Sequence, residues 1–260
     1  MREKLFIRNR KKKNLSIIVE KHKKQNGLVF IMHGLGGFKE QGHLQIVADA
    51  FRQKNFTVVR FDVANSVGEG EGCLENARAT NYYQDLEDVI AWSKIQSWYQ
   101  EPFALAGHSL GGICISMYAQ KNPKKVSLLA PISTVVSGKL VYESHKKYDF
   151  DDPNVCRKIS WLKGLKTTDT KKIKKLAQAF IRDCMKYNLL KEVSKLTMPV
   201  LLVAGDRDGT IPRDHIEILY QALPEPKELC IIKNAPHTFR SKKHLRELKK
   251  IFLGWIEKYA

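Results

Sequence analysis

Residues 103–112 read Phe-Ala-Leu-Ala-Gly-His-Ser-Leu-Gly-Gly. The four apolar residues at 103–106 predict a buried strand, and the apolar-faced stretch 110–120 predicts a helix. Only a sharp turn separates these two elements, and its glycines allow neighbouring segments to pass close to each other. A strand, a tight turn and a helix in direct succession indicate a parallel sheet flanked by helices.

The same alternation continues on both sides of this unit. Further strands are predicted at 5–9, 15–20, 28–32, 57–62, 126–130, 200–204 and 228–232. Further helices are predicted at about 41–54, 82–96, 213–221 and 242–259. The first two strands are joined by a basic turn and should form a hairpin at the sheet edge, and Asn81 is expected to cap the helix that follows it. These elements predict an α/β protein with a mostly parallel central sheet.

One region breaks the alternation. Residues 137–196 are polar, rich in lysine and poor in β-branched runs, and only 170–185 has clear helical periodicity. We interpret 137–196 as a helical cap or lid insertion over one end of the sheet. The core is then divided into an N-terminal part, 1–136, and a C-terminal part, 197–260.

The chain is strongly basic, with a formal net charge of +18 in 260 residues. The excess is mostly lysine and is spread along the chain, and no zinc-finger spacing, RNP sequence or basic leucine-zipper pattern accompanies it. We therefore expect a solvated lysine-rich surface and no nucleic-acid partner. An acidic partner, such as an anionic substrate, is the alternative explanation.

Cysteine spacing indicates whether disulfides or a zinc site are expected, and hydropathy indicates whether the chain could span a membrane. The five cysteines include no CxxC pair, which favours reduced thiols over a disulfide framework or a zinc site. The apolar runs are far shorter than the roughly 20 residues of a membrane span, and the N-terminus lacks the pattern of a secretory signal. We expect no transmembrane segment and a cytoplasmic location. The pattern does not indicate an oligomeric state.

The turn at 107–111 matches the pattern G-x-S-x-G with Ser109 at its centre. On a sharp strand-to-helix turn, the serine hydroxyl stands clear of the sheet and lies at a helix N-terminus, where backbone N–H groups face developing negative charge. A glycine-rich tight turn with no catalytic role could have the same sequence pattern. The preceding strand and following helix favour a nucleophilic serine.

A serine nucleophile needs a base, and the base needs an orienting group. In this arrangement the acid and then the histidine follow the serine along the chain. Asp206 and Asp208 follow the strand at 200–204, and His237 follows the strand at 228–232. His237 is the best candidate base because active sites of open α/β sheets lie past the carboxyl ends of strands. Other histidines compete on composition only; these are His145, in the insertion, and His215 and His244, which should be exposed on helices.

The chain resembles the α/β-hydrolase superfamily over about 15–259, and within it the feruloyl or cinnamoyl esterases and the serine-aminopeptidase-like enzymes. The resemblance is carried by the Ser109 turn, by His-Gly-Leu-Gly-Gly at 33–37, Phe-Asp at 61–62, Gly-Asp-Arg-Asp at 205–208 and Pro-His at 236–237. It implies Asp208 rather than Asp206 as the acid. It also implies an oxyanion hole made by the backbone N–H groups of Leu35 and Leu110, with His33 in a structural role.

The expected activity is hydrolysis of a small-molecule carboxylic ester with a small to medium acyl group, through an acyl-enzyme. No cofactor or metal is expected, because the chain has no phosphate loop and no ligand-spaced cluster. A thioesterase or a peptidase would use the same three residues. A non-catalytic ligand-binding homologue is the alternative of a different class.

Overall fold

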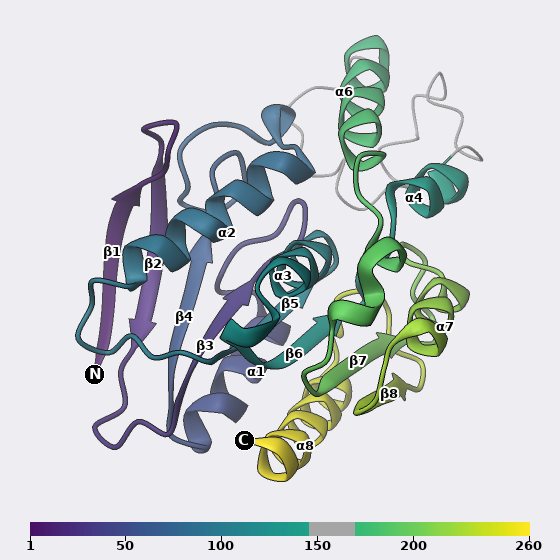
Figure 1. Cartoon of the computed structure of the whole chain (residues 1–260). Helices are drawn as coiled ribbons and strands as arrows, with labels where there is room; N and C mark the ends of the chain where they lie inside the picture. Colours follow the sequence, from purple (N-terminus) through teal and green to yellow (C-terminus); the bar gives the residue numbers. More distant parts are fainter. Residues whose placement is uncertain (146–169) are drawn as a thin grey trace.

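The computed structural model of the chain describes residues 1–145 and 170–260. Within these ranges eight strands form one sheet in the order β1-β2-β4-β3-β5-β6-β7-β8 (Figure 1). The strands are β1 (Arg2–Arg8), β2 (Asn14–Glu20), β3 (Gly27–Met32), β4 (Phe56–Asp62), β5 (Phe103–His108), β6 (Val126–Ile132), β7 (Val200–Gly205) and β8 (Lys227–Ile232). Strands β4 to β8 and β3 run parallel, while β1–β2 and β2–β4 pair antiparallel. The predicted parallel sheet and its edge hairpin are confirmed.

Helices cover both faces of the sheet. The described α-helices are α1 (Gly42–Gln53), α2 (Ala79–Ser93), α3 (Leu110–Lys121), α4 (Gly138–His145), α6 (Thr170–Cys184), α7 (Arg213–Ala222) and α8 (Lys242–Tyr259). Alternate side chains of β3 pack into two hydrophobic cores, one on each face of the sheet. Phe30 packs into the core under α2, α3 and α7, and Ile31 packs into the core under α1 and α8. This alternation follows from the period of two in a strand.

The start of α2 differs from the prediction. The predicted cap at Asn81 is wrong, because α2 begins at Ala79 and Asn81 lies inside the helix. An acceptor from a distant part of the chain replaces the local cap: Asp183 of α6 accepts hydrogen bonds from the backbone N–H and the hydroxyl of Thr80, both at 2.8 Å. A partner about a hundred residues away leaves no local sequence signal.

The segment between β6 and β7 includes α4, α6 and the 3₁₀ helix η4 (Leu189–Lys195). Figure 1 shows α4 and α6 beyond the ends of the strands rather than on a face of the sheet. Residues 146–169 of the predicted cap lie outside the described residues, so its boundaries at 137 and 196 stay a prediction. None of the helices within 1–145 and 170–260 is long and apolar enough to cross a membrane.

Candidate active site

Ser109 sits at the junction of β5 and α3 with a positive φ of 54°. Such a backbone conformation costs a non-glycine residue about 1–3 kcal/mol and must be held by its surroundings. The backbone N–H of Ser109 donates to the carbonyl of Ile132 at 2.9 Å. Close packing of the turn also depends on its glycines, since a Cβ on Gly111 would lie 2.6 Å from the carbonyl oxygen of His33. The fold thus holds Ser109 in a strained conformation at the sharp turn that the sequence predicted.

Asp208 and His237 meet beyond the ends of β7 and β8. His237 Nδ1 donates to Asp208 Oδ2 at 2.7 Å, and the Asp208 side chain is 1% exposed. The other carboxylate oxygen, Oδ1, accepts the backbone N–H groups of Thr210 at 2.8 Å and Ile211 at 2.9 Å. These bonds fix the carboxylate and place the proton of a neutral imidazole on Nδ1, so that Nε2 is free to accept a proton. Asp206, the other candidate acid, is exposed.

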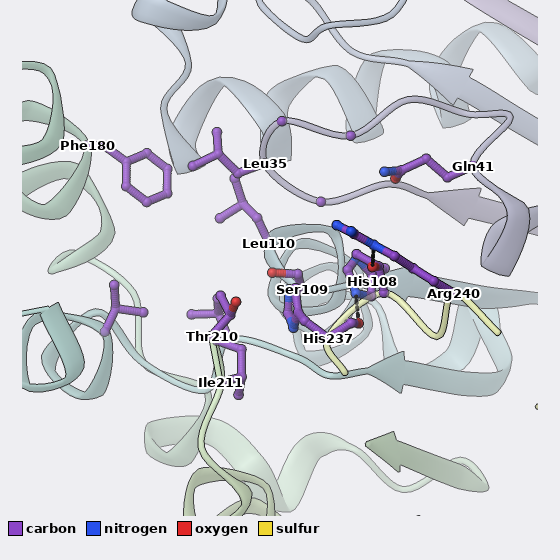
Figure 2. A pocket seen from close by; sticks show the side chains of 16 residues that line it. Leu35, Gln41, His108, Ser109, Leu110, Phe180, Thr210, Ile211, His237 and Arg240 are labelled. Carbon is purple, nitrogen blue, oxygen red and sulfur yellow. Dashed lines mark hydrogen bonds between the residues drawn. The ribbon is translucent and has the colours of Figure 1, made fainter. Parts of the chain in front are cut away.

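Ser109 and His237 line the same pocket (Figure 2). Among the described residues no hydrogen bond joins their side chains. In hydrolases such bonds commonly tighten only when substrate is bound. The competing histidines His215 and His244 do not line this pocket. Both are buried, so the expectation that they are exposed on helices was wrong. The side chain of His145 lies outside the described residues.

The predicted oxyanion donors also lie at this pocket. Leu35 and Leu110 both line it. Within the described part of the chain, neither backbone N–H has an intramolecular acceptor. Two unpaired N–H groups beside a serine at a helix N-terminus are the arrangement that stabilises an oxyanion.

Two buried histidines support the His237 loop, a role that sequence analysis missed. The ring of His108 lies 4.5 Å from that of His237 and 4.4 Å from that of His43, between centroids. His108 Nε2 donates to the carbonyl oxygen of His237 at 2.8 Å. Burial lowers the pKa of His43 to about 3 and that of His108 well below its usual value. Both imidazoles are therefore neutral at physiological pH and act as packing and hydrogen-bonding groups. The only sequence feature that could have indicated this supporting role was the position of His108 directly before Ser109.

A buried charge network holds the loop that carries Leu35. Lys39 is 2% exposed, and its Nζ donates to Asp62 at 2.6 Å and to Glu69 at 2.5 Å. Nearby, His33 is fully buried, with Nδ1 2.8 Å from the carbonyl oxygen of Gly34, which fits its predicted structural role. A lysine in a basic sequence gives no hint of burial. The two acids that neutralise it are supplied by other segments.

The pocket has ends of different chemistry. One end contains Phe180, and the apolar residues that line the pocket are Leu35, Leu110, Val135, Val141, Phe180 and Ile211. The other end is polar and is lined by Gln41, Thr238 and Arg240. Figure 2 shows Phe180 on one side of Ser109 and Gln41 and Arg240 on the other. Within the described residues, no group of three His, Cys, Asp or Glu side chains is arranged to hold a metal ion.

Comparison with known families identifies the family of the chain. Residues 23–241 match the family described as serine aminopeptidase, S33. The chain belongs to this family. Among curated proteins, this S33 family member is similar to the bovine mitochondrial palmitoyl-protein thioesterase ABHD10, with 23% identity over 230 residues, which cover 86% of this chain and 71% of the relative.

Solved structures extend the comparison to the whole fold. Est1E from Butyrivibrio proteoclasticus, with ferulic acid bound, superposes with a TM-score of 0.78 at 19% identity over 98% of each chain. Mouse ABHD10 superposes with a TM-score of 0.73 at 22% identity over 99% of this chain and 100% of the mouse chain. These likenesses confirm the α/β-hydrolase fold expected from the sequence.

Proposed function

We propose that the chain is a serine hydrolase that cleaves carboxylic esters of small to medium acyl groups. In this proposal Ser109 is the nucleophile, His237 the general base and Asp208 the group that orients it. The observation that carries the proposal is the 2.7 Å bond between His237 Nδ1 and a doubly anchored Asp208, in the pocket that Ser109 lines. Membership of a hydrolase family supports it.

The reaction would follow the acyl-enzyme route. His237 Nε2 takes the proton of Ser109 as Oγ attacks the ester carbonyl carbon. The carbonyl oxygen becomes an oxyanion, which accepts hydrogen bonds from the N–H groups of Leu35 and Leu110. The C–O bond to the alcohol then breaks, and the alcohol leaves with the proton held by His237. Water adds to the acyl carbon with His237 as base, and the acid is released from Ser109. Asp208 stays ionised and stabilises the imidazolium.

Thioester hydrolysis is the second candidate. The tetrahedral intermediate is the same and only the leaving atom changes from oxygen to sulfur. This candidate is favoured by the similarity to a protein named palmitoyl-protein thioesterase. The two activities can be ranked by measuring kcat/KM for matched butyryl esters and butyryl thioesters. If kcat/KM for the thioester were at least about tenfold higher, thioester hydrolysis would replace ester hydrolysis as the assigned activity.

The cytoplasmic location predicted from the sequence is also kept as a proposal. The bovine and mouse relatives are named as mitochondrial. Fractionation of cells that express the protein would distinguish the two locations, and recovery with mitochondria would contradict the proposal.

The proposed nucleophile can be tested with a fluorophosphonate probe and intact-mass detection. We expect one adduct on the wild type and none on Ser109→Ala. Ser116→Ala is the matched control, because Ser116 lies on α3 and outside the pocket, with its hydroxyl bonded to the carbonyl of Gly112 at 2.8 Å. This control should still react.

An adduct that persists in Ser109→Ala would refute the assignment. If the folded wild type gave no adduct, a non-catalytic ligand-binding homologue would replace the enzyme as the explanation. If the adduct depends on Ser109, esters of 4-nitrophenol with increasing acyl length would measure how long an acyl chain the apolar end accepts.

A further inference from the structure

The polar end of the pocket lies where a leaving group would bind. The imidazole that activates Ser109 must also protonate the leaving group, so that group departs beside His237. Thr238 and Arg240 follow His237 on the same loop, and both line the pocket. The apolar end, marked by Phe180, lies on the opposite side of Ser109 (Figure 2). The acyl and leaving groups therefore meet different surroundings.

Arg240 gives the polar end an uncompensated positive charge. Its Nε donates to the hydroxyl of Thr238 at 2.9 Å, which holds the side chain and leaves the terminal nitrogens available. Among the described residues no carboxylate pairs with Arg240 and none lines this pocket. Among the described arginines, five are paired with acids, namely Arg2, Arg10, Arg52, Arg60 and Arg213. Other described arginines, such as Arg207 and Arg246, also lack an acid, so Arg240 is distinguished by its place in the pocket. An exposed arginine without an acid, at the mouth of a reactive pocket, is suited to bind an anion.

Gln41 provides a second unfilled polar position. It lines the pocket near Arg240, and its Oε1 atom is buried without a hydrogen-bond partner in the described structure. Buried polar atoms almost always have partners, and an amide oxygen accepts, so this orphan indicates a place for a hydroxyl or N–H group of a ligand rather than for an anion. The same residues, Gln41, Thr238 and Arg240, also border an adjacent hollow that includes Phe38 and Glu40. The charge of Glu40 is paired with Arg2 at 2.6 Å. The polar end thus continues into space that a larger leaving group could occupy.

We propose that Arg240 forms a subsite for an anionic leaving group, beside a Gln41 oxygen that can accept a hydrogen bond from a hydroxyl or N–H of the same group. The substrate class is an ester or thioester of a small to medium apolar acid with an alcohol or thiol that carries a carboxylate or a phosphate. This inference rests on the proposed hydrolase function and names the half of the substrate that the function leaves open. It also assigns a specific residue to the anionic substrate that the sequence left as the alternative explanation of the positive charge.

The test compares two chromogenic esters that differ in one charge: 4-nitrophenyl butyrate and 3-carboxy-4-nitrophenyl butyrate. The wild type should favour the carboxylated ester in kcat/KM by about tenfold, the lower range for a charge-assisted hydrogen bond at an exposed site. The preference should arise mainly in KM and should shrink as salt is added. Arg240→Gln should abolish the preference, and Arg240→Glu should reverse it. Arg246→Gln, an exposed arginine on α8 outside the pocket, should change neither ester.

Inhibition of neutral-ester hydrolysis by benzoate and by phenyl phosphate identifies the anion. If benzoate or phenyl phosphate inhibits the wild type but not Arg240→Gln, the result supports the subsite. The stronger of the two inhibitors shows whether the subsite prefers a carboxylate or a phosphate. An equal preference in the wild type and Arg240→Gln would overturn the subsite while Ser109-dependent hydrolysis of both esters still supports the proposed function. If the folded wild type hydrolysed neither ester, the proposed function and the subsite would both fail. Fluorophosphonate labelling of each variant checks that the site remains intact.

Discussion

Replacing Asp208 with asparagine would test how the proposed triad is oriented. The oxygen Oδ1 of Asp208 accepts two backbone N–H groups, from Thr210 and Ile211. An amide NH₂ cannot face two donors, so the oxygen of the introduced amide must keep this position, and its nitrogen must face His237. The imidazole would then have to accept at Nδ1 and carry its proton on Nε2. In that tautomer it cannot take a proton from Ser109.

The expected size of the effect follows from this change of tautomer. The fixed backbone donors prevent the amide from rotating out of the unfavourable orientation. We therefore expect Asp208→Asn to lower kcat by about 10⁴-fold, or about 5.5 kcal/mol of transition-state stabilisation. Because the shape and the two backbone bonds are retained, the loss in unfolding free energy should be no more than about 2 kcal/mol.

Hydrolysis of 4-nitrophenyl butyrate measures kcat, and urea unfolding checks the fold. Asp206→Asn is the matched control, since Asp206 is exposed two residues away, and its kcat should stay within about threefold of the wild type, as expected for a surface change. The reasoning would be refuted if Asp208→Asn kept more than a tenth of the wild-type kcat, or if Asp206→Asn caused the large loss.

Two further predictions concern the turn and a buried acid. Gly111→Ala would place a Cβ 2.6 Å from the His33 carbonyl oxygen, so urea unfolding should show a loss of about 2 kcal/mol; Gly254→Ala, with nothing within 4 Å of its added Cβ, should show none. Burial raises the pKa of Asp85 from 3.8 to about 6, so the native state binds this proton more tightly than the unfolded state. The stabilisation that the protonated carboxyl provides is therefore lost as the pH rises through the interval between these two pKa values. The stability of Asp85→Asn relative to the wild type should therefore increase by about 2 kcal/mol from pH 4 to pH 7, and a difference independent of pH would contradict the burial argument.

The local features of the fold could be predicted because each depends on neighbouring residues. Apolar runs marked the buried strands, and helical periodicity marked α3 and α8. The Ser109 turn was recognisable since its glycines and its strand and helix all lie within one short segment. The start of α2 was not predictable, because its cap is supplied by Asp183 from a distant helix.

The sequence by itself determined the order of strands and helices, the reactive turn at Ser109 and His237 as the best candidate base. From the residues alone it left Asp206 and Asp208 open, and only the resemblance to a family favoured one. Tertiary structure decided the partner of His237, because the loops after β7 and β8 bring Asp208 within 2.7 Å. It also decided which charges are compensated: Lys39 is buried between two acids, while Arg240 faces the pocket without one. Charge pairing depends on distances between segments far apart in the chain, and these distances exist only after folding.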